Sequence, residues 1–153
     1  MKRLAVFILG LVLSVSFIGC TRYRLTAPEG FAEVKRQGAG TFLAVSPEGV
    51  QMSIKTRRNY PKQDLQYWQT AMREHMLEAG YQLIAGPAGF ETEKRQGVYF
   101  EWGAPYQGKD CIYLTGLVVS GRRLLVIEAG GEVTDFNRHR EEIINSLKNM
   151  STF

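Results

Sequence analysis

The segment from Asp110 to Ala129 constrains the fold more than any other part of this chain, because it is apolar along both of its halves. Two runs rich in β-branched and aromatic residues flank Ser120-Gly121-Arg122, where the glycine supplies the positive φ of a tight turn. Neither run alternates between apolar and polar residues. We therefore expect a β-hairpin at the centre of a sheet, with both faces covered by other elements.

A second hairpin is predicted upstream, around Ser46-Pro47-Glu48-Gly49, which has the composition of a turn. Its second arm places Val50, Met52 and Ile54 on one face and polar residues on the other, the period of a half-buried strand. The composition predicts three further strands, at 31–36 on an edge, at 81–85 and at 97–103. We expect a turn at 86–89 after the second of these and a loop at 104–109 after the third.

Two segments have the period of a helix. In 62–79 apolar residues recur at helical spacing, Asp64 can cap the amino end, and Gly80 suits the carboxyl end. We expect its Trp68, Met72 and Met76 to belong to the core, although such a stripe could also be a ligand box.

The second predicted helix follows Gly130-Gly131, which we expect to end the preceding strand. Thr134 or Asp135 would cap this helix. A mostly antiparallel sheet between two helices gives the predicted fold class, α+β, as a three-layer α/β/α sandwich. The apolar stripe of this helix is Phe136, Arg140, Ile143, Ile144 and Leu147.

The amino-terminal segment has the pattern of a secretory signal, with Met1-Lys2-Arg3 followed by an apolar run from Leu4 to Ile18. A transmembrane helix is the alternative. Fifteen residues rising about 1.5 Å each fall short of the roughly 30 Å hydrocarbon core, which favours the signal.

The residues Phe17-Ile18-Gly19-Cys20 resemble the lipobox of bacterial lipoproteins. The resemblance implies a cleaved signal peptide over 1–19 and a diacylglyceryl group plus an amide-linked acyl chain on Cys20. Three acyl chains would anchor the protein stably in a membrane. We expect a short polar tether over 20–30 and a globular domain over 31–153. The residue after the cysteine is Thr21 and not the aspartate that signals inner-membrane retention in enterobacterial lipoproteins. The resemblance therefore favours the outer membrane, with the domain facing the periplasm.

The charge balance gives little support to a nucleic-acid partner. The sequence has 19 basic and 15 acidic side chains, and loss of Lys2 and Arg3 with the signal leaves 17 against 15. The basic residues are scattered along the sequence and interrupted by acids. We therefore interpret them as solvated surface and expect no nucleic acid as partner.

The sequence contains no recognisable catalytic or metal-binding motif. His75 and His139 lack metal-ligand spacing, and the chain has no nucleophile elbow, P-loop or complete dinucleotide fingerprint. We predict no enzyme activity, no metal and no cofactor. With Cys20 lipidated, Cys111 is left as a single thiol, either a small buried apolar residue or a reactive group able to form an intermolecular disulfide.

The order of elements, with segments 97–101, 113–119 and 123–127 and a closing helix at Asp135-Phe136, resembles the PsbP-like fold over about residues 28–150. That group is similar to the thylakoid PsbP subunits, the Ran-binding Mog proteins, DcrB-type envelope lipoproteins and chaperones of secreted effectors. Most of them bind proteins and they share no catalytic residue. The resemblance therefore implies a non-catalytic protein-binding or assembly module whose partner is another envelope protein.

The segment 86–109 is rich in glycine, proline and aromatic residues, a composition suited to recognition. We predict a protein-binding patch formed by Tyr99, Trp102 and Tyr106, with Glu101 at its rim. Alternatively, Trp102 belongs to the core, and Glu101 is a tuned acid. Two other functions stay open: binding of a small apolar or lipidic ligand in a pocket between helix and sheet, and an enzyme.

Overall fold

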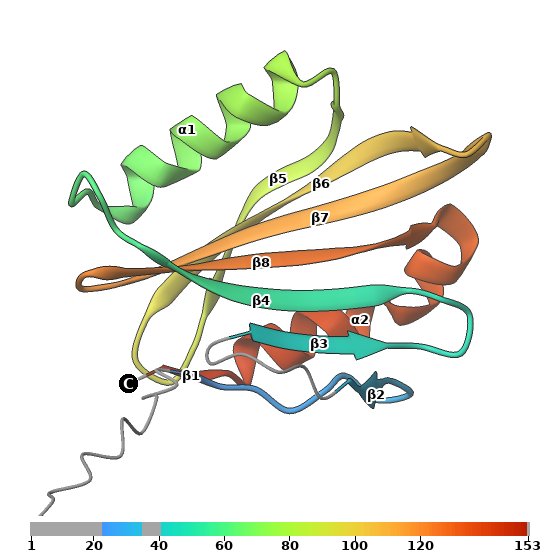
Figure 1. Cartoon of the computed structure of the whole chain (residues 1–153), viewed down its shortest axis with the longest axis horizontal. Helices are drawn as coiled ribbons and strands as arrows, with labels where there is room; N and C mark the ends of the chain where they lie inside the picture. Colours follow the sequence, from blue (N-terminus) through green and yellow to red (C-terminus); the bar gives the residue numbers. More distant parts are fainter. Residues whose placement is uncertain (1–22, 35–40, 153) are drawn as a thin grey trace, which may run out of the picture.

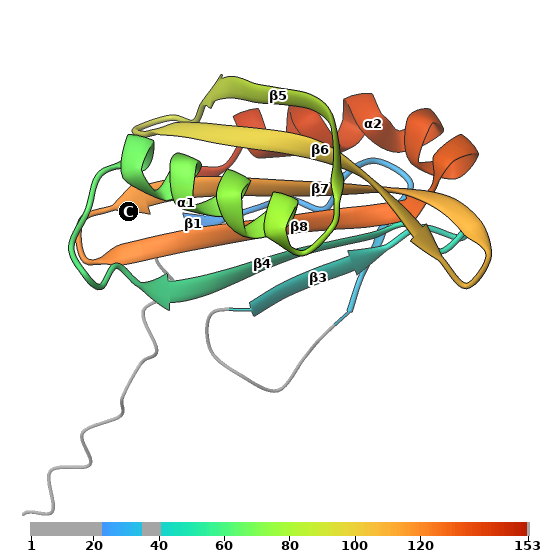
Figure 2. The same cartoon turned by 90° about the horizontal axis from the view of Figure 1, so that it is seen from above.

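The computed structural model describes residues 23–34 and 41–152. Seven strands form one antiparallel sheet in the order β2-β3-β4-β8-β7-β6-β5, with one helix on each face (Figure 1 and Figure 2). The predicted α+β sandwich is therefore confirmed. The elements of this sandwich are β2 (Ala32–Glu33), β3 (Thr41–Val45), β4 (Gln51–Arg58), α1 (Leu65–Glu78), β5 (Gln82–Glu91), β6 (Gln96–Tyr106), β7 (Lys109–Ser120), β8 (Arg123–Glu132) and α2 (Val133–Lys148).

The predicted central hairpin is confirmed as β7 and β8, which turn at Gly121 with φ 58°. Alternate side chains of each strand enter different layers, so both faces are buried. Leu114 and Ile127, each 0% exposed, pack in the layer that contains α2, and Leu117 packs in the layer that contains α1.

The two helical layers differ in extent. On the α2 side a single cluster joins Phe136, Ile143 and Leu147 to the apolar residues of β3, β4, β7 and β8. On the α1 side the buried residues divide into two small clusters, one around Phe100 and Trp102 and one around Leu117. The predicted role of the apolar stripe of α1 in the core is confirmed, since Met76 is buried in one cluster and Met72 and Trp68 are partly buried and pack against the two clusters.

The helix ends are set by different means. Asp64 caps α1 as predicted, its side chain accepting from the Tyr67 amide at 2.9 Å, and Gly80 has φ 86° after the last turn. The helix predicted at the carboxyl end is present as α2, but its predicted N-cap, Thr134 or Asp135, was wrong. Its N-cap is Glu132, which makes no side-chain capping bond, because β8 continues through the two glycines and leads directly into the helix.

Two segments predicted as turn or loop are strand. Residues 86–89 lie inside β5, where shifts in register absorb the irregularity, and the turn instead falls at 92–95, where the Thr92 amide donates to the Arg95 carbonyl. Residues 104–106 extend β6, leaving only Gln107 (φ 51°) and Gly108 (φ 76°) as the turn. Pairing with a long neighbouring strand overrides the local preference of glycine and proline here.

The predicted tether over 20–30 is part of the domain where the structure describes it. β1 (Tyr23–Arg24) pairs with β9 (Ser151–Thr152), and Tyr23 is 5% exposed with its hydroxyl donating to the Ile54 carbonyl at 3.2 Å. Ser146 Oγ donates to the Thr26 carbonyl at 2.7 Å. The domain therefore begins by Tyr23 and not at Phe31, because alternate residues of this segment pack on the core.

Several predictions fall wholly or partly outside the described residues. The edge strand predicted at 31–36 is present as β2, and its last two residues are not described. The signal segment and Cys20 lie outside the described residues as well. Within 23–34 and 41–152, no helix has the length and apolarity needed to span a membrane.

Candidate binding groove

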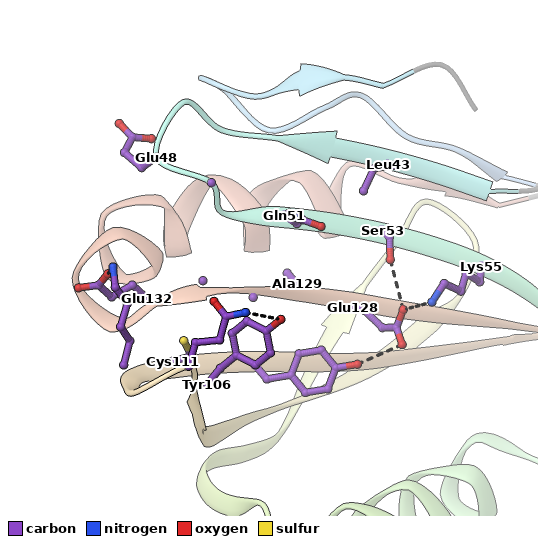
Figure 3. Close-up of a pocket in the computed structure, with 16 residues that line it drawn as sticks. Leu43, Glu48, Gln51, Ser53, Lys55, Tyr106, Cys111, Glu128, Ala129 and Glu132 are labelled. Atoms are coloured by element: carbon purple, nitrogen blue, oxygen red, sulfur yellow. Dashed lines mark hydrogen bonds and ion pairs between the residues drawn. The ribbon is translucent and has the colours of Figure 1, made fainter. Parts of the chain in front are cut away.

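Helix α1 covers only part of its face of the sheet, packing over β5, β6 and β7 (Figure 2). The neighbouring surface over β4 and the second half of β8 stays open and forms a groove of about 600 Å³ (Figure 3). We call this the sheet groove. Among the residues that line it are Leu43, Gln51, Ser53, Lys55, Tyr106, Cys111, Tyr113, Glu128 and Gly130.

The floor of the sheet groove is kept low by a glycine. Gly130 stands between Gln51 of β4 and Tyr113 of β7 in the strand register. A Cβ at this position would lie 3.3 Å from the Ile112 carbonyl oxygen and 3.5 Å from Cδ2 of the Tyr113 ring. A larger residue would therefore crowd Tyr113 and fill the hollow.

The carboxylate of Glu128 is the centre of a polar network on one wall of the groove (Figure 3). It accepts from Lys55 Nζ at 2.5 Å, from the Tyr113 hydroxyl at 3.0 Å and from Ser53 Oγ at 3.3 Å. Burial acts to raise the pKa of Glu128, but the hydrogen bonds from Lys55 and Tyr113 outweigh it and the pKa is lowered. Burial, with the nearby negative charge of Glu128, raises the pKa of Tyr113. The wall thus presents an ionised carboxylate and a neutral phenol that are hydrogen-bonded to each other.

The rim of the groove combines exposed and paired side chains. Tyr106, 65% exposed, stands at the tip of the β6–β7 hairpin. Lys109 pairs with Glu132 at 2.6 Å, and this hydrogen bond raises the pKa of Lys109. Glu48 accepts from His139 at 2.9 Å, a hydrogen bond that lowers the pKa of Glu48 to about 2. Cys111 is partly exposed in the wall of the groove and forms no disulfide.

The structure does not bring the four predicted binding residues into one patch. Trp102 is 0% exposed and its indole N–H donates to Thr115 Oγ1 at 2.8 Å, so the alternative that it belongs to the core is confirmed. Glu101 is 5% exposed and forms an ion pair with Arg140 of α2 at 2.9 Å, which places it inside the sandwich instead of at a rim.

The other two predicted residues lie apart from each other. Tyr99 is half-buried and packs against the cluster on the α2 side of the sheet. Tyr106 is the predicted residue that lines the sheet groove. Alternation along β6 is the reason, since consecutive positions of one strand point to opposite faces.

The wall residues Ser53, Lys55, Tyr113 and Glu128 were not among the predicted site residues. One signal was available: Glu128 interrupts the apolar run of a central strand. Such a carboxylate needs either a partner or solvent. That α1 stops short of this part of the sheet is a tertiary fact with no local signature.

Groups of three or more His, Cys, Asp or Glu side chains placed to hold a metal do not occur within the described part of the chain. His75 is exposed on α1. His139 packs edge-to-face on Phe31, with ring centroids 5.1 Å apart, besides its bond to Glu48.

The fold is shared with PsbP-like proteins. Cyanobacterial PsbP (CyanoP) from Synechocystis sp. PCC 6803 superposes with a TM-score of 0.62 at 10% identity, over 87% of this chain and 88% of that one. LpqN of Mycobacterium tuberculosis, described as involved in cell envelope biogenesis, gives 0.60 at 10% identity, over 84% and 82%. At such identities the likeness shows the fold alone.

A structure from Bacteroides thetaiotaomicron matches with a TM-score of 0.52 at 13% identity and covers 86% of this chain. The chain spans only 45% of that protein's length. Comparison with protein-family models found no match, and comparison with curated protein sequences found none either.

Proposed function

We propose that this chain is a lipid-anchored protein of the bacterial cell envelope, attached through Cys20 to the outer membrane and facing the periplasm. Its domain is a non-catalytic module that binds another envelope protein in the sheet groove. The lipobox-like residues before Cys20 support the anchor. The shared fold with LpqN, whose description places it in cell envelope biogenesis, supports the location.

The binding role rests on one observation: α1 leaves the surface over β4 and the second half of β8 uncovered. An open groove with a shallow glycine floor suits an extended or flat protein surface. The exposed Tyr106 offers a large contact area at low entropic cost. The ionisable groups of the wall are paired with one another, so they favour recognition of polar groups and not proton transfer.

A crosslink from inside the groove tests this function. Cys111 lies in the groove wall, so a thiol-linked photocrosslinker on it should capture the partner in intact envelopes. The matched control moves the thiol to the exposed outer face of α1 with Cys111→Ser and Gln66→Cys. We expect a product from Cys111 that is absent from the Gln66 position and reduced about tenfold by Tyr106→Ala.

Identical products from both thiol positions would contradict the groove as the binding surface. So would a Cys111 product that Tyr106→Ala leaves unchanged. Tyr106→Ala should not alter the melting temperature, because the side chain is exposed at a hairpin tip.

A second candidate function, binding of a small apolar ligand, is favoured by a hollow of about 670 Å³ beside the first turn of α1. The lining includes Leu65, Gln69, Pro87, Phe90, Val98 and Lys148. Under the remainder of α1, Met76, Phe100 and Trp102 occupy the layer. Binding of a fluorescent fatty acid that Gln69→Trp abolishes would support this function, and binding unaffected by that change would contradict it.

A further inference from the structure

Basic side chains gather at one end of the sandwich, the end at the left of Figure 1, where the β7–β8 turn, the β5–β6 turn, the start of α1 and the end of α2 lie. We call this the basic end. It has nine exposed basic residues against three acidic ones, Asp64, Glu91 and Glu93. The basic residues are Arg24, Arg57, Arg58, Lys62, Lys94, Arg95, Arg122, Arg123 and Lys148.

The strand register brings these residues together from distant parts of the sequence. Arg58 is the cross-strand partner of Arg123, so the ends of β4 and β8 place like charges side by side. The buried Asn59 fixes the adjoining turns, because its side-chain amide donates to the carbonyls of Gln63 and Gly121. Its oxygen accepts from the indole of Trp68 on α1 at 2.7 Å. The turns that carry Arg58 and Arg122 are therefore joined to each other and to α1.

The opposite end of the molecule is acidic. Around the turns at 47–49 and 107–108 and the start of α2, the exposed or partly exposed acids include Glu48, Asp110, Glu132 and Asp135. The basic residues there, Lys109 and Arg138, are in ion pairs. At the basic end, the arginines, Lys62 and Lys148 form no ion pair with another described residue. Clustered basic charge that is not neutralised by ion pairs attracts an anionic surface from outside.

The chain leaves the described structure at the same end. β1 and its partner β9 lie at the same end of the molecule as the β5–β6 turn (Figure 1). Tyr23 is fixed in the core, and only two residues lie between it and Cys20, so the two Cα atoms are at most about 11 Å apart. This step rests on the anchor proposed above. A membrane that holds Cys20 would therefore lie close to Tyr23, within about one Debye length or little more, and the side chains of the basic end that approach it more closely would be attracted to anionic headgroups.

We propose that the basic end binds the anionic phospholipid headgroups of the membrane, and so orients the domain with its acidic end outward. The charge asymmetry and the exit point of the chain agree in direction although they are independent features. The sheet groove, near the acidic end, is then presented to partners away from the lipid surface.

Vesicle binding by an unlipidated chain beginning at Thr21 tests the proposal without depending on the anchor. This chain keeps every described contact, since the core is closed by residues between Tyr23 and Thr152. We expect sedimentation with phosphatidylcholine vesicles that contain phosphatidylglycerol, little with phosphatidylcholine alone, and release by high salt.

Two matched pairs of substitutions separate the basic end from net charge. Arg122→Gln with Arg123→Gln should weaken vesicle binding by about 5- to 25-fold, since each basic residue at an anionic surface contributes about fivefold. Arg73→Gln with Arg138→Gln removes the same charge from exposed positions outside the basic end and should weaken it less than about threefold.

Three results would overturn the proposal. The first is no binding to anionic vesicles at low salt. The second is an equal loss for the two pairs, which would assign binding to net charge alone. The third is tighter binding to DNA or RNA of matched charge than to vesicles, which would assign the basic end to a nucleic acid. Failure of lipidation at Cys20, by contrast, would contradict the anchor and leave this measurement unaffected.

Discussion

The two faces of the sheet are built from the same strands but are covered to different extents. On one face, α2 with its 16 residues packs into a single continuous cluster that extends from β3 to β7. On the other, α1 with 14 residues covers β5 to β7 and leaves the polar side chains of β4 and β8 open. We therefore expect stability to be concentrated in the α2 layer, whereas the α1 side leaves part of the sheet surface uncovered.

The largest effect is expected in the α2 layer. Ile127 is 0% exposed and packs over Gly116, so Ile127→Ala should lower the free energy of unfolding by about 3 to 5 kcal/mol. Met76→Ala in the smaller α1 cluster should cost about 2 kcal/mol. Urea denaturation of both variants measures the contrast. Equal losses would mean that the two layers stabilise the fold alike.

The next effect concerns the ion pair that joins the sheet to α2. Glu101→Ala should cost about 2 to 4 kcal/mol, because Arg140 would be left without its carboxylate at 2.9 Å. Arg140 is 38% exposed, which keeps the cost below that of a fully buried pair. Thermal unfolding of Glu101→Ala and of the double variant with Arg140→Ala checks this. A double variant no more stable than Glu101→Ala would contradict the stranded-charge explanation.

A smaller, pH-dependent effect is expected in the groove wall. The pKa of Glu128 is lowered in the folded state, so the stability that its ionised form contributes is present above the ordinary carboxyl pKa of about 4.3. This contribution is lost as the pH falls below that value. Glu128→Gln should therefore cost about 1 kcal/mol at neutral pH and less in acid, as measured by denaturation across pH. A cost that does not change with pH would show that charge has no part in it.

The smallest effect on stability is expected at the tip of the β6–β7 hairpin. Tyr106→Ala should change the free energy of unfolding by less than about 0.5 kcal/mol, because the ring is 65% exposed. Calorimetry of the purified domain measures this change. A loss above about 1 kcal/mol would mean that Tyr106 supports the fold and is not free for a partner.

Much of the fold could be predicted from the sequence because its main signals are local. The apolar β7–β8 hairpin, the alternation in β4 and the helical period with Asp64 and Gly80 each lie within a short segment. The errors fall where tertiary pairing overrides local preference. Strand pairing extends β5 through the glycines at 86–89 and β6 through 104–106, and it draws Tyr23 into the domain.

The candidate sites could be predicted far less well. The sequence suggested one aromatic patch on β6, but alternation along that strand divides its members between two layers. The arginines interpreted as scattered are brought to one end by the antiparallel register, which pairs Arg58 with Arg123. Neighbours in sequence thus lie in different layers, and residues distant in sequence lie side by side, so sequence separation predicts neither arrangement. The sheet groove itself depends on how far α1 reaches, which periodicity cannot show.

The pairing of β1 with β9 also fixes the order in which the domain can be completed. Tyr23 pairs with Thr152, so this contact cannot form until nearly all of the described chain has been synthesised. Apart from the long-range pairing of β4 with β8, the strands of the main sheet pair with neighbours in sequence, and these hairpins can form earlier. Under the proposed anchoring, Tyr23 would dock late, so the domain would be fixed close to the membrane only in the last step of folding.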